Sequence, residues 1–177
     1  MRESVSAPAF RDALAQFASG VTIIAARQGE QLAGLTATAF SSVSLEPPLV
    51  LVCVARAAGA HEAVLNAGRV GISVLAAEQG WVARQFARHG VDKFDGVPLV
   101  PGDGVPLVDG ALAHLECRPH ARHAAGDHTI LVAEVVAASA AGGKPLLHYS
   151  RKLGGFTVDA ALPLEAPVSV TTNGEPR

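Results

Sequence analysis

The sequence predicts a mainly β domain, a Greek-key or barrel-like sheet with short helices packed outside it. About six short apolar runs rich in β-branched residues follow one another at hairpin-like spacing. Helical segments are few and do not alternate with strands as βαβ units would, and no Gly-x-Gly-x-x-Gly motif follows a strand. The chain also holds 18 glycines and 11 prolines, which implies many turns.

The first expected element is a helix at Pro8–Ala18. Phe10, Leu14 and Phe17 fall on one face of it, at positions i, i+4 and i+7. A proline begins the segment and Gly20 lies just past its end, as is typical of helix boundaries. A single apolar face suits a helix that packs on the outside of a sheet.

Strands are expected where β-branched and apolar residues run together between turn residues. The run at Leu49–Ala55 is continuously apolar, which predicts burial of both its faces. Thr36–Ser44 is expected to be a loop, ended by Pro47 and Pro48, and Gly90–Gly110 to be the longest loop. The expected strands are Val21–Ala26, Gln31–Leu35, Leu49–Ala55, Val70–Leu75, Ala111–Arg118, Thr129–Ala137 and Leu153–Val158. Two further helices are expected at His61–Asn66 and Glu78–Arg88.

Length and cysteine usage indicate one self-supporting domain. A chain of 177 residues can bury a core without disulfides or metal. Cys53 and Cys117 lie in apolar strand-like runs, so buried free thiols in a reducing compartment are the favoured interpretation. We place the domain at residues 1–161 and a frayed C-terminal tail at residues 162–177, which contain three prolines and a polar end.

Charge and hydropathy exclude several classes of partner. The net charge is −2 and basic residues are scattered singly, which disfavours nucleic acid and anionic membranes. Mean hydropathy is +0.30, yet every apolar run is far shorter than the roughly 18 residues that a membrane span needs. Charged residues near the N-terminus interrupt any apolar core of a secretory signal. We therefore expect a cytoplasmic protein.

The Thr36–Ser44 segment is the first candidate for chemistry. It has five hydroxyl residues and no charge among its nine positions. Small side chains let backbone N–H groups approach a flat ligand, and hydroxyls can donate to ring carbonyls or phosphates. Taken alone, the segment favours the alternative, a Ser/Thr-rich strand whose hydroxyls bond the neighbouring backbone.

The triplet Gly126-Asp127-His128 is the second candidate. Gly126 and Asp127 suit a tight turn, and His128 then begins an apolar strand. A histidine in this place can reach into a pocket and titrates near neutral pH. The alternative, which the triplet alone favours, is a hairpin turn whose histidine bonds a neighbour.

His114, Cys117, His120 and His123 follow one another at three-residue spacing, and four such ligands are enough for tetrahedral zinc. Strand alternation nevertheless places His114 and Cys117 on opposite faces, and Pro119 interrupts the run. The spacing also matches no standard zinc pattern. We therefore expect no metal site, and a small zinc-dependent hydrolase is the outside alternative.

Taken together and in order, several motifs resemble the flavin reductase family of FMN-binding split barrels. Each motif is weak alone, but their joint order and spacing over residues 8–158 make the match specific. The motifs are Phe10-Arg11-x2-Leu14-x2-Phe17-x-Ser19-Gly20-Val21-Thr22, Gly34-Leu35-Thr36-Ala37-Thr38-Ala39-Phe40-Ser41-Ser42-Val43-Ser44-Leu45-x-Pro47-Pro48-Leu49-Val50, Gly71-Ile72-x-Val74-Leu75, Gln85-Phe86-Ala87, Lys93-Phe94 and Gly126-Asp127-His128-Thr129. The resemblance implies a split barrel in a small homodimer that supplies reduced flavin to a separate monooxygenase.

The resemblance also implies which residues would contact the flavin. The isoalloxazine ring and ribityl chain would be held by Thr36, Ala37, Thr38, Ala39, Ser41, Ser42, Val43 and Ser44. The flavin phosphate would face Arg56, Ala57 and Ala58. The phosphate or adenylate end would be closed over by Gln85, Phe86, Ala87, Lys93 and Phe94.

For the nicotinamide, the resemblance implies the cleft beside Gly126, Asp127 and His128, with Tyr149 and Arg151 near the same mouth. Because the flavin itself carries the reactivity, we assign His128 the role of stacking on or orienting the nicotinamide rather than that of an obligatory acid. The protein's task is then to position the two rings for hydride transfer from nicotinamide C4 to flavin N5.

The chain departs from the family pattern at two places. Hydroxyls or a lysine commonly follow the strand at Leu49–Ala55, where this chain has Arg56, Ala57 and Ala58. The position of Ala39 is also often polar in relatives. Both changes bear on how the phosphate is held and leave the choice between FMN and FAD open, with FAD favoured.

The sequence thus predicts an NAD(P)H:flavin oxidoreductase, with NADH favoured over NADPH as co-substrate. A weak hold on the phosphate would suit an enzyme that releases reduced flavin as a diffusible product. The alternative within the same fold is a non-catalytic flavin- or haem-binding module with a structural or sensing role.

Overall fold

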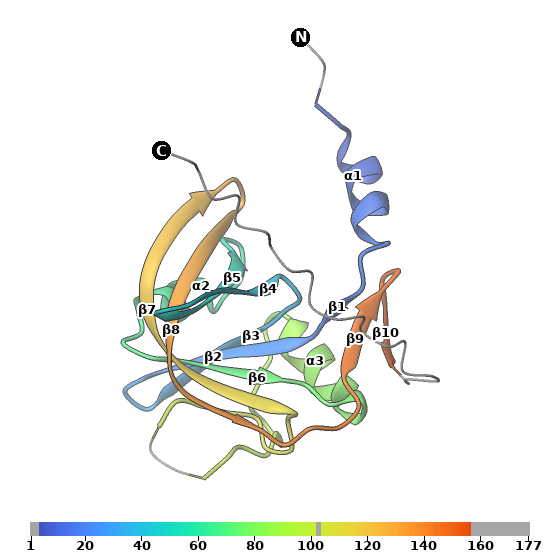
Figure 1. Cartoon of the computed structure of the whole chain (residues 1–177). Coiled ribbons are helices and arrows are strands. Elements are labelled where there is room, and N and C mark those ends of the chain that lie inside the picture. Colours follow the sequence, from blue (N-terminus) through green and yellow to red (C-terminus); the bar gives the residue numbers. More distant parts are fainter. Residues whose placement is uncertain (1–3, 102–103, 157–177) are drawn as a thin grey trace, which may run out of the picture.

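A computed structural model describes residues 4–101 and 104–156 as a large curved sheet, a small second sheet and short helices (Figure 1). The large sheet consists of β2 (Thr22–Gln28), β3 (Gln31–Ala37), β4 (Phe40–Leu45), β5 (Pro48–Ala55), β6 (Val70–Val74), β7 (Ala113–Ala125) and β8 (His128–Ala140). The small sheet consists of β1 (Ser19–Gly20), β9 (Leu146–Tyr149) and β10 (Lys152–Gly155). The helices are α1 (Ala7–Leu14), α2 (His61–Asn66), the 3-10 turn η1 (Ala77–Gln79) and α3 (Gly80–Ala87).

The order of strands in the large sheet explains why it forms a split barrel. The order is β3-β2-β6-β7-β8-β5-β4, and all these pairings are antiparallel. The two edge strands, β3 and β4, are nevertheless consecutive in the chain and are joined only by Thr38 and Ala39. The sheet must therefore curl until its two edges meet at this link, without pairing along their length.

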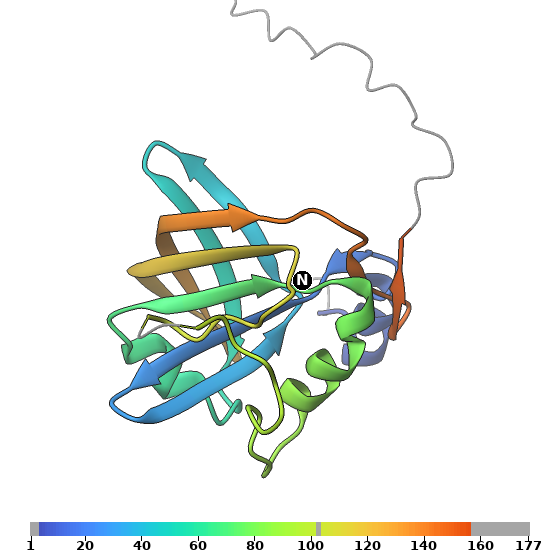
Figure 2. The same ribbon diagram turned by 90° about the horizontal axis from the view of Figure 1, so that it is seen from below.

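Helix α3 and the small sheet lie beside each other at one end of the large sheet, as Figure 2 shows. The backbone N–H of Ala77 donates to the carbonyl of Lys144 at 2.9 Å, and Leu146 packs into the same apolar cluster as Val82 and Phe86 of α3. Helix α1 is capped at its N-terminus by Ser6, whose hydroxyl accepts a hydrogen bond from the Ala9 N–H at 3.4 Å.

Strand β2 divides the core into two clusters because it is buried on both faces. Ile24 and Ala26 face the inside of the curved sheet, together with Val52 and Val54 of β5. Ile23 and Ala25 face the other way, toward α3. A strand that is covered on both sides needs apolar residues at consecutive positions, which is the pattern that β2 carries.

The predicted mainly β class with peripheral helices is confirmed, and several details are corrected. Thr36–Ser44 is not a loop, because it contains the end of β3 and most of β4. Leu49–Ala55 is not buried on both faces: Val50, Val52 and Val54 are buried, and the residues between them are only half-buried. The helix predicted at Pro8–Ala18 ends at Leu14, so Phe17 lies beyond it.

The C-terminal part of the sheet also differs from the prediction. Strands β7 and β8 are longer than expected and form a hairpin with two register shifts. Strand β9 was not predicted, and the strand expected at Leu153–Val158 is β10, Lys152–Gly155. The expected tail at residues 162–177 and the domain boundary at residue 161 lie outside the described residues and stay predictions.

Candidate functional site

The Thr36–Ser44 segment lies at the split of the barrel. Since β3 pairs only with β2 and β4 only with β5, each has one free edge in the described structure. An edge strand leaves every second N–H and C=O group without a partner strand. The segment therefore offers main-chain donors and acceptors to a flat polar ligand, apart from the carbonyls of Ala37 and Ala39, which accept from Thr22 Oγ1 at 2.8 Å and from the Cys53 N–H at 3.0 Å. It carries no charged side chain.

Four of the five hydroxyls of this segment divide into two groups, and the fifth, on Ser42, is exposed. Thr36 Oγ1 donates to the Ala83 carbonyl of α3 at 2.7 Å, Ser41 Oγ donates to the Ser42 carbonyl at 3.0 Å, and Ser44 Oγ accepts from the Glu46 N–H at 3.2 Å. These three serve the fold, as the alternative interpretation of the segment expected. Thr38, by contrast, lines a cavity with Ala39, and Ala37 beside them is buried.

That cavity has a volume of about 430 Å³ and lies between the link from β3 to β4, helix α1 and the turn after β9. Its apolar walls come mainly from the helix side. Its lining residues are Phe10, Arg11, Leu14, Ala15, Phe17, Ser19, Thr38, Ala39, His148 and Arg151. Phe10 and Leu14 were predicted only as a helix face, and their placement against the Thr38–Ala39 link could not be read from periodicity.

A second cavity of about 300 Å³ lies beside the first half of β3, next to the loop at residues 88–94. Lys93 and Phe94 line it together with Gly34, Gly59 and Ala60. Lys93 Nζ donates to the Gly34 carbonyl at 3.1 Å, and burial lowers the pKa of Lys93. The Lys93 ammonium group therefore contacts the backbone two residues before the Thr36–Ser44 segment.

Gln85 and Phe86 hold this loop in place. Gln85 Nε2 donates to the carbonyls of Lys93 at 3.1 Å and Asp95 at 2.8 Å. Phe86 has no exposed surface and meets Phe94 edge to face, with ring centroids 4.9 Å apart. Gly34 permits this packing, because a Cβ there would lie 2.7 Å from Phe86 Cε1. Ala87, the next residue, is exposed.

The structure brings the expected phosphate residues and the Gly126–His128 turn together. His128 pairs across the sheet with Ala55, and the Arg56 N–H donates to the Asp127 carbonyl at 2.9 Å. Ala57 and Ala58 continue the loop from there, the first exposed and the second half-buried. Gly126 has a φ of 62°, which confirms that the turn needs a glycine.

His128 and Asp127 form a pair at this turn. His128 Nδ1 lies 2.8 Å from Asp127 Oδ1, and because a carboxylate only accepts, Nδ1 carries the donated proton. This hydrogen bond is the main cause that lowers the pKa of Asp127. The His128 side chain is 42% exposed, so its ring remains accessible to a ligand.

Tyr149 and Arg151 lie elsewhere, on the tight turn between β9 and β10. Tyr149 donates to Gln16 Oε1 at 3.2 Å, and Arg151 forms an ion pair with Asp12. Both contacts are with α1 and the residues after it, and Arg151 faces the cavity beside Ala39. Within one chain this turn and the β7–β8 hairpin end lie on opposite sides of the molecule (Figure 1), so His128 and Arg151 do not share one mouth.

Comparison of the sequence with known proteins shows the family to which this chain belongs. The sequence model of the flavin reductase-like domain matches residues 14–157. The chain belongs to this family. An NADH-dependent FMN reductase of Agrobacterium fabrum is 42% identical over 149 residues, covering 84% of this chain and 85% of the relative. The reductase component of 4-hydroxyphenylacetate 3-monooxygenase from Thermus thermophilus is 45% identical over 148 residues, covering 81% and 92%.

A solved structure extends the likeness to the fold. The NADH:FAD oxidoreductase of Streptomyces globisporus, in complex with NAD and FAD fragments, matches with a TM-score of 0.81 and 39% identity, covering 89% of this chain and 99% of that one. The predicted family and class of enzyme, an NAD(P)H:flavin oxidoreductase, are thereby confirmed. The named relatives include both FMN and FAD reductases, in agreement with the prediction that left both flavins open.

Of the four residues considered for zinc, His114 and Cys117 have other roles in this flavin reductase-like chain, and His120 and His123 are exposed. His114 Nε2 lies 2.7 Å from the Val108 carbonyl, and Cys117 is buried in the core. Burial, with the nearby Glu116 charge, raises the pKa of Cys117 to about 11. Over residues 4–101 and 104–156, no three His, Cys, Asp or Glu side chains are grouped to hold a metal ion.

Proposed function

We propose that the chain is an NADH-dependent flavin reductase that supplies reduced FAD or FMN to a separate flavin-dependent monooxygenase. The observation that carries this proposal is the uncharged Thr36–Ser44 segment, which joins two free sheet edges beside a cavity of about 430 Å³. Relatives named as NADH-dependent flavin reductases and as monooxygenase reductase components support it.

The residues at the split fit a flavin. The pyrimidine edge of an oxidised isoalloxazine ring presents an acceptor, a donor and an acceptor at C2=O, N3–H and C4=O, which N–H and C=O groups on the free edge of a strand can complement. Thr38 and Ala39 add little bulk at the point where the ring would lie, and Phe10, Leu14 and Phe17 supply apolar surface for its faces. When bound, the flavin supplies the redox chemistry by accepting a hydride from the nicotinamide.

At the phosphate end the chain offers few fixed charges. Arg56 is exposed, Ala57 adds only its main-chain N–H, and the Ala58 N–H already donates to the Ala55 carbonyl at 3.0 Å. Lys93 lines the second cavity, and its Nζ donates a hydrogen bond to the Gly34 carbonyl. A phosphate held in this way gains less than one held by several convergent side chains, which suits a flavin that leaves after reduction.

His128 is assigned an orienting role. Asp127 fixes Nδ1 as the protonated nitrogen, which leaves Nε2 of the neutral ring as an acceptor. An acceptor on a half-exposed ring can hold the carboxamide of a nicotinamide in register with the flavin. Positioning of this kind lowers the entropic cost of bringing two free reactants together for reaction.

The chain is further proposed to work as a homodimer. The outward residues of β5 and β8, Leu49, Leu51, Cys53, Ile130 and Val132, are apolar and only half-buried in one chain. A second copy on this face would account for the continuous apolar run of β5. Sedimentation is expected to give a dimer for the wild type and a monomer for Leu51→Asp, with Val100→Asp on an exposed loop as control.

The cytoplasmic location expected from the sequence stays a proposal. Across the described ranges, no helix has the length and apolar character needed to cross a bilayer. The test of location is fractionation of the native host cells with an antibody against the chain.

Steady-state assays test the proposed activity. NADH and NADPH oxidation are measured with FMN, FAD and riboflavin as acceptors. The proposal expects one NADH consumed per flavin reduced under anaerobic conditions, NADH preferred to NADPH, and no oxidation without flavin. A chain that binds flavin but leaves NADH unoxidised is a non-catalytic module, and this result would overturn the proposal.

Release of the product is tested separately. The chain and NADH are placed on one side of a dialysis membrane without oxygen, and cytochrome c on the other, with FMN free to cross. Reduction of cytochrome c only when chain, NADH and FMN are all present shows that reduced flavin leaves the protein. Its absence, with NADH oxidised on the first side, would show that the flavin stays bound.

A further inference from the structure

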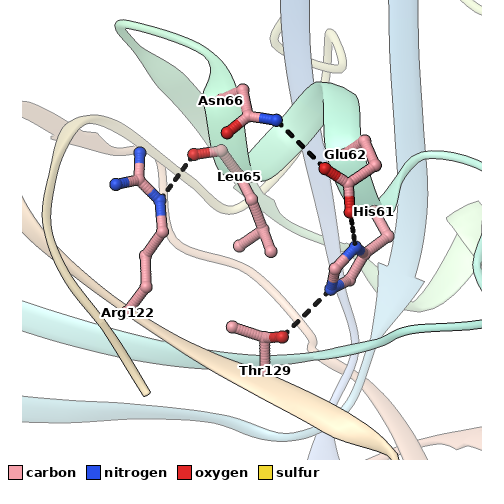
Figure 3. A network of polar contacts seen from close by, with 6 residues as sticks. All are labelled: His61, Glu62, Leu65, Asn66, Arg122 and Thr129. Carbon is pink, nitrogen blue, oxygen red and sulfur yellow. Dashed lines mark hydrogen bonds and ion pairs between the residues drawn. The ribbon is translucent and has the colours of Figure 1, made fainter. Parts of the chain in front are cut away.

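A buried histidine outside the expected site joins α2 to the strand that follows the Gly126–His128 turn (Figure 3). His61, the first residue of α2, is 9% exposed, and its Nε2 lies 3.0 Å from Thr129 Oγ1, which is equally buried. Its Nδ1 lies 2.9 Å from Glu62 Oε1. No motif pointed to His61, because its partner Thr129 is 68 residues away in the chain.

The donors in this network follow from the chemistry of the partners. The Glu62 carboxylate only accepts, so Nδ1 of His61 carries the proton. In the neutral ring Nε2 is then an acceptor, and the Thr129 hydroxyl donates to it. His61 thus uses both ring nitrogens, and Asn66 Nδ2 donates to the other Glu62 oxygen at 3.1 Å.

The position of this histidine connects two segments of the proposed site. The His61 N–H donates to the Ala58 carbonyl at 2.9 Å, which fixes the far end of the loop that starts at Arg56. The near end of the loop is fixed by the Arg56 N–H, which donates to the Asp127 carbonyl. Thr129 directly follows His128. Through its backbone and its ring, His61 therefore ties the end of the 56–60 loop to the strand that carries His128.

We propose that His61, through Thr129, is a positioning residue that sets the 56–60 loop and the 126–129 turn at one fixed separation, so that flavin phosphate and nicotinamide bind in register. The inference rests on the proposed function. His61 touches neither ligand and acts only through the segments it joins. Loss of the Nε2–Oγ1 hydrogen bond should therefore weaken the binding of both ligands and leave the maximal rate nearly unchanged.

A second contact between α2 and the β7–β8 hairpin supplies the matched control. Arg122 Nε donates to the Leu65 carbonyl at the other end of α2, at 2.7 Å (Figure 3). It docks the same helix on the same hairpin but lies away from the 56–60 loop. If docking of α2 were all that mattered, removing this contact would have the same effect as removing the contact of His61.

Four variants separate the hydrogen bond from general packing. Thr129→Val removes the hydroxyl at nearly constant volume, and Thr129→Ser restores it. His61→Asn places an amide near Nδ1 and loses the contact with Thr129, whereas His61→Gln places it near Nε2 and keeps that contact. Arg122→Met is the control. Each is made in the full chain, and KM for FMN, KM for NADH, kcat and the thermal midpoint are measured.

We expect Thr129→Val and His61→Asn to raise both KM values about three- to tenfold with kcat within about twofold of wild type. Thr129→Ser and His61→Gln should restore both KM values. Arg122→Met should lower the thermal midpoint and leave both KM values unchanged. Wild-type KM values in folded Thr129→Val and His61→Asn, or equally raised KM values in Arg122→Met, would overturn the inference.

Two further outcomes, an inactive wild type and variants that do not fold, also bear on the inference. A wild-type chain that does not oxidise NADH with any flavin contradicts the proposed function, and the inference is then decided by the FMN dissociation constants of the same variants. If Thr129→Val and His61→Asn do not fold, backbone amide hydrogen exchange of the wild type, measured with and without FMN, tests the inference instead. Bound FMN should then slow exchange both at residues 56–60 and at residues 126–129, and slowing at residues 56–60 alone would contradict the inference.

Discussion

Helices α1 and α3 flank the split of the barrel, each is 8 residues long, and they are held in opposite ways. Helix α3 buries Val82, Ala83 and Phe86 against β2, whereas α1 buries none of its residues. Phe10 and Leu14 of α1 are 52% and 56% exposed, although they form as clear an apolar face as the buried residues of α3. An apolar face thus indicates a helix, but it does not indicate what fraction of that face is buried by the rest of the same chain.

The contacts that do hold α1 come from the turn after β9. The Ser150 N–H donates to the Ala15 carbonyl at 2.8 Å, and the Tyr149 and Arg151 side chains bond Gln16 and Asp12. Ser150 and Arg151 adopt the left-handed conformation, with φ of 47° and 61°, which non-glycine residues seldom adopt. Helix α3, with the loop at residues 88–94 that packs on it, therefore belongs to the core, and we call it the core wall. Helix α1, which lines the cavity beside Ala39, is attached to the rest of the chain by surface contacts, and we call it the attached wall.

The largest expected difference between the two walls is in stability. Phe86→Ala should lower the free energy of unfolding by about 3–5 kcal/mol, because it leaves a cavity in the core. Leu14→Ala should change it by no more than about 0.5 kcal/mol, as is usual at exposed positions. Urea unfolding of both variants checks this. A similar loss for Leu14→Ala would show that α1 is covered in solution.

A smaller effect is expected from the close approach of β3 to α3. Gly34→Ala should cost about 1–3 kcal/mol, because its Cβ would lie 2.7 Å from Phe86 and 3.1 Å from Phe94. Displacement of Phe94 should also move Lys93 and weaken flavin binding. Gly20→Ala is the control, since a Cβ there meets nothing within 4 Å. Equal stability of the two variants would contradict the tight packing of this wall.

The attached wall should respond to salt. Asp12→Asn should lower the free energy of unfolding by less than about 1 kcal/mol, because both Asp12 and Arg151 are about two-thirds exposed. The difference should vanish in about 1 M NaCl, which screens exposed pairs. Thermal melts at low and high salt provide the measurement. A loss that persists at high salt would mean that Asp12 does more than pair with Arg151.

The smallest effect concerns the pH dependence of the core wall. Burial lowers the pKa of Lys93 below its ordinary value of 10.5, so between the two values the unfolded chain binds more protons than the folded one. The Lys93 contribution to stability should therefore rise with pH toward 10.5. The difference in unfolding free energy between wild type and Lys93→Met, followed from pH 8 upward, reports it. A difference that falls over this range would contradict the assigned sign.

Sequence patterns predicted the parts of the fold that are encoded locally. The β-branched run at Val21–Ala26, the glycine turn at Gly126 and the face of Phe10 and Leu14 each follow from residues close together in the chain. The order and spacing of motifs also indicated the family. Strand β4 was missed because an edge strand with a bulge and exposed serines shows no alternation of apolar residues.

Contacts between distant segments could not be predicted in this way. Gln85 and Phe86 matched a motif expected at the flavin, but the closure of the loop at residues 88–94 turns them into its supports. Tyr149 and Arg151 pair with α1 because β9 joins β1, a pairing of four-residue and two-residue strands that no pattern marks. The burial of the outer face of β5 likewise depends on whether a second chain packs on it, which no local pattern indicates.

The central claim is that the link between β3 and β4 lies where the flavin ring binds, and one variant tests it most directly. Ala39→Leu extends a branched side chain from an exposed position into the cavity of about 430 Å³, and Ala138→Leu makes the same change at an exposed site on β8. FMN dissociation constants are measured by fluorescence titration. Ala39→Leu should weaken FMN binding at least about tenfold, with the thermal midpoint and Ala138→Leu both unchanged. Wild-type FMN affinity in Ala39→Leu would contradict the account.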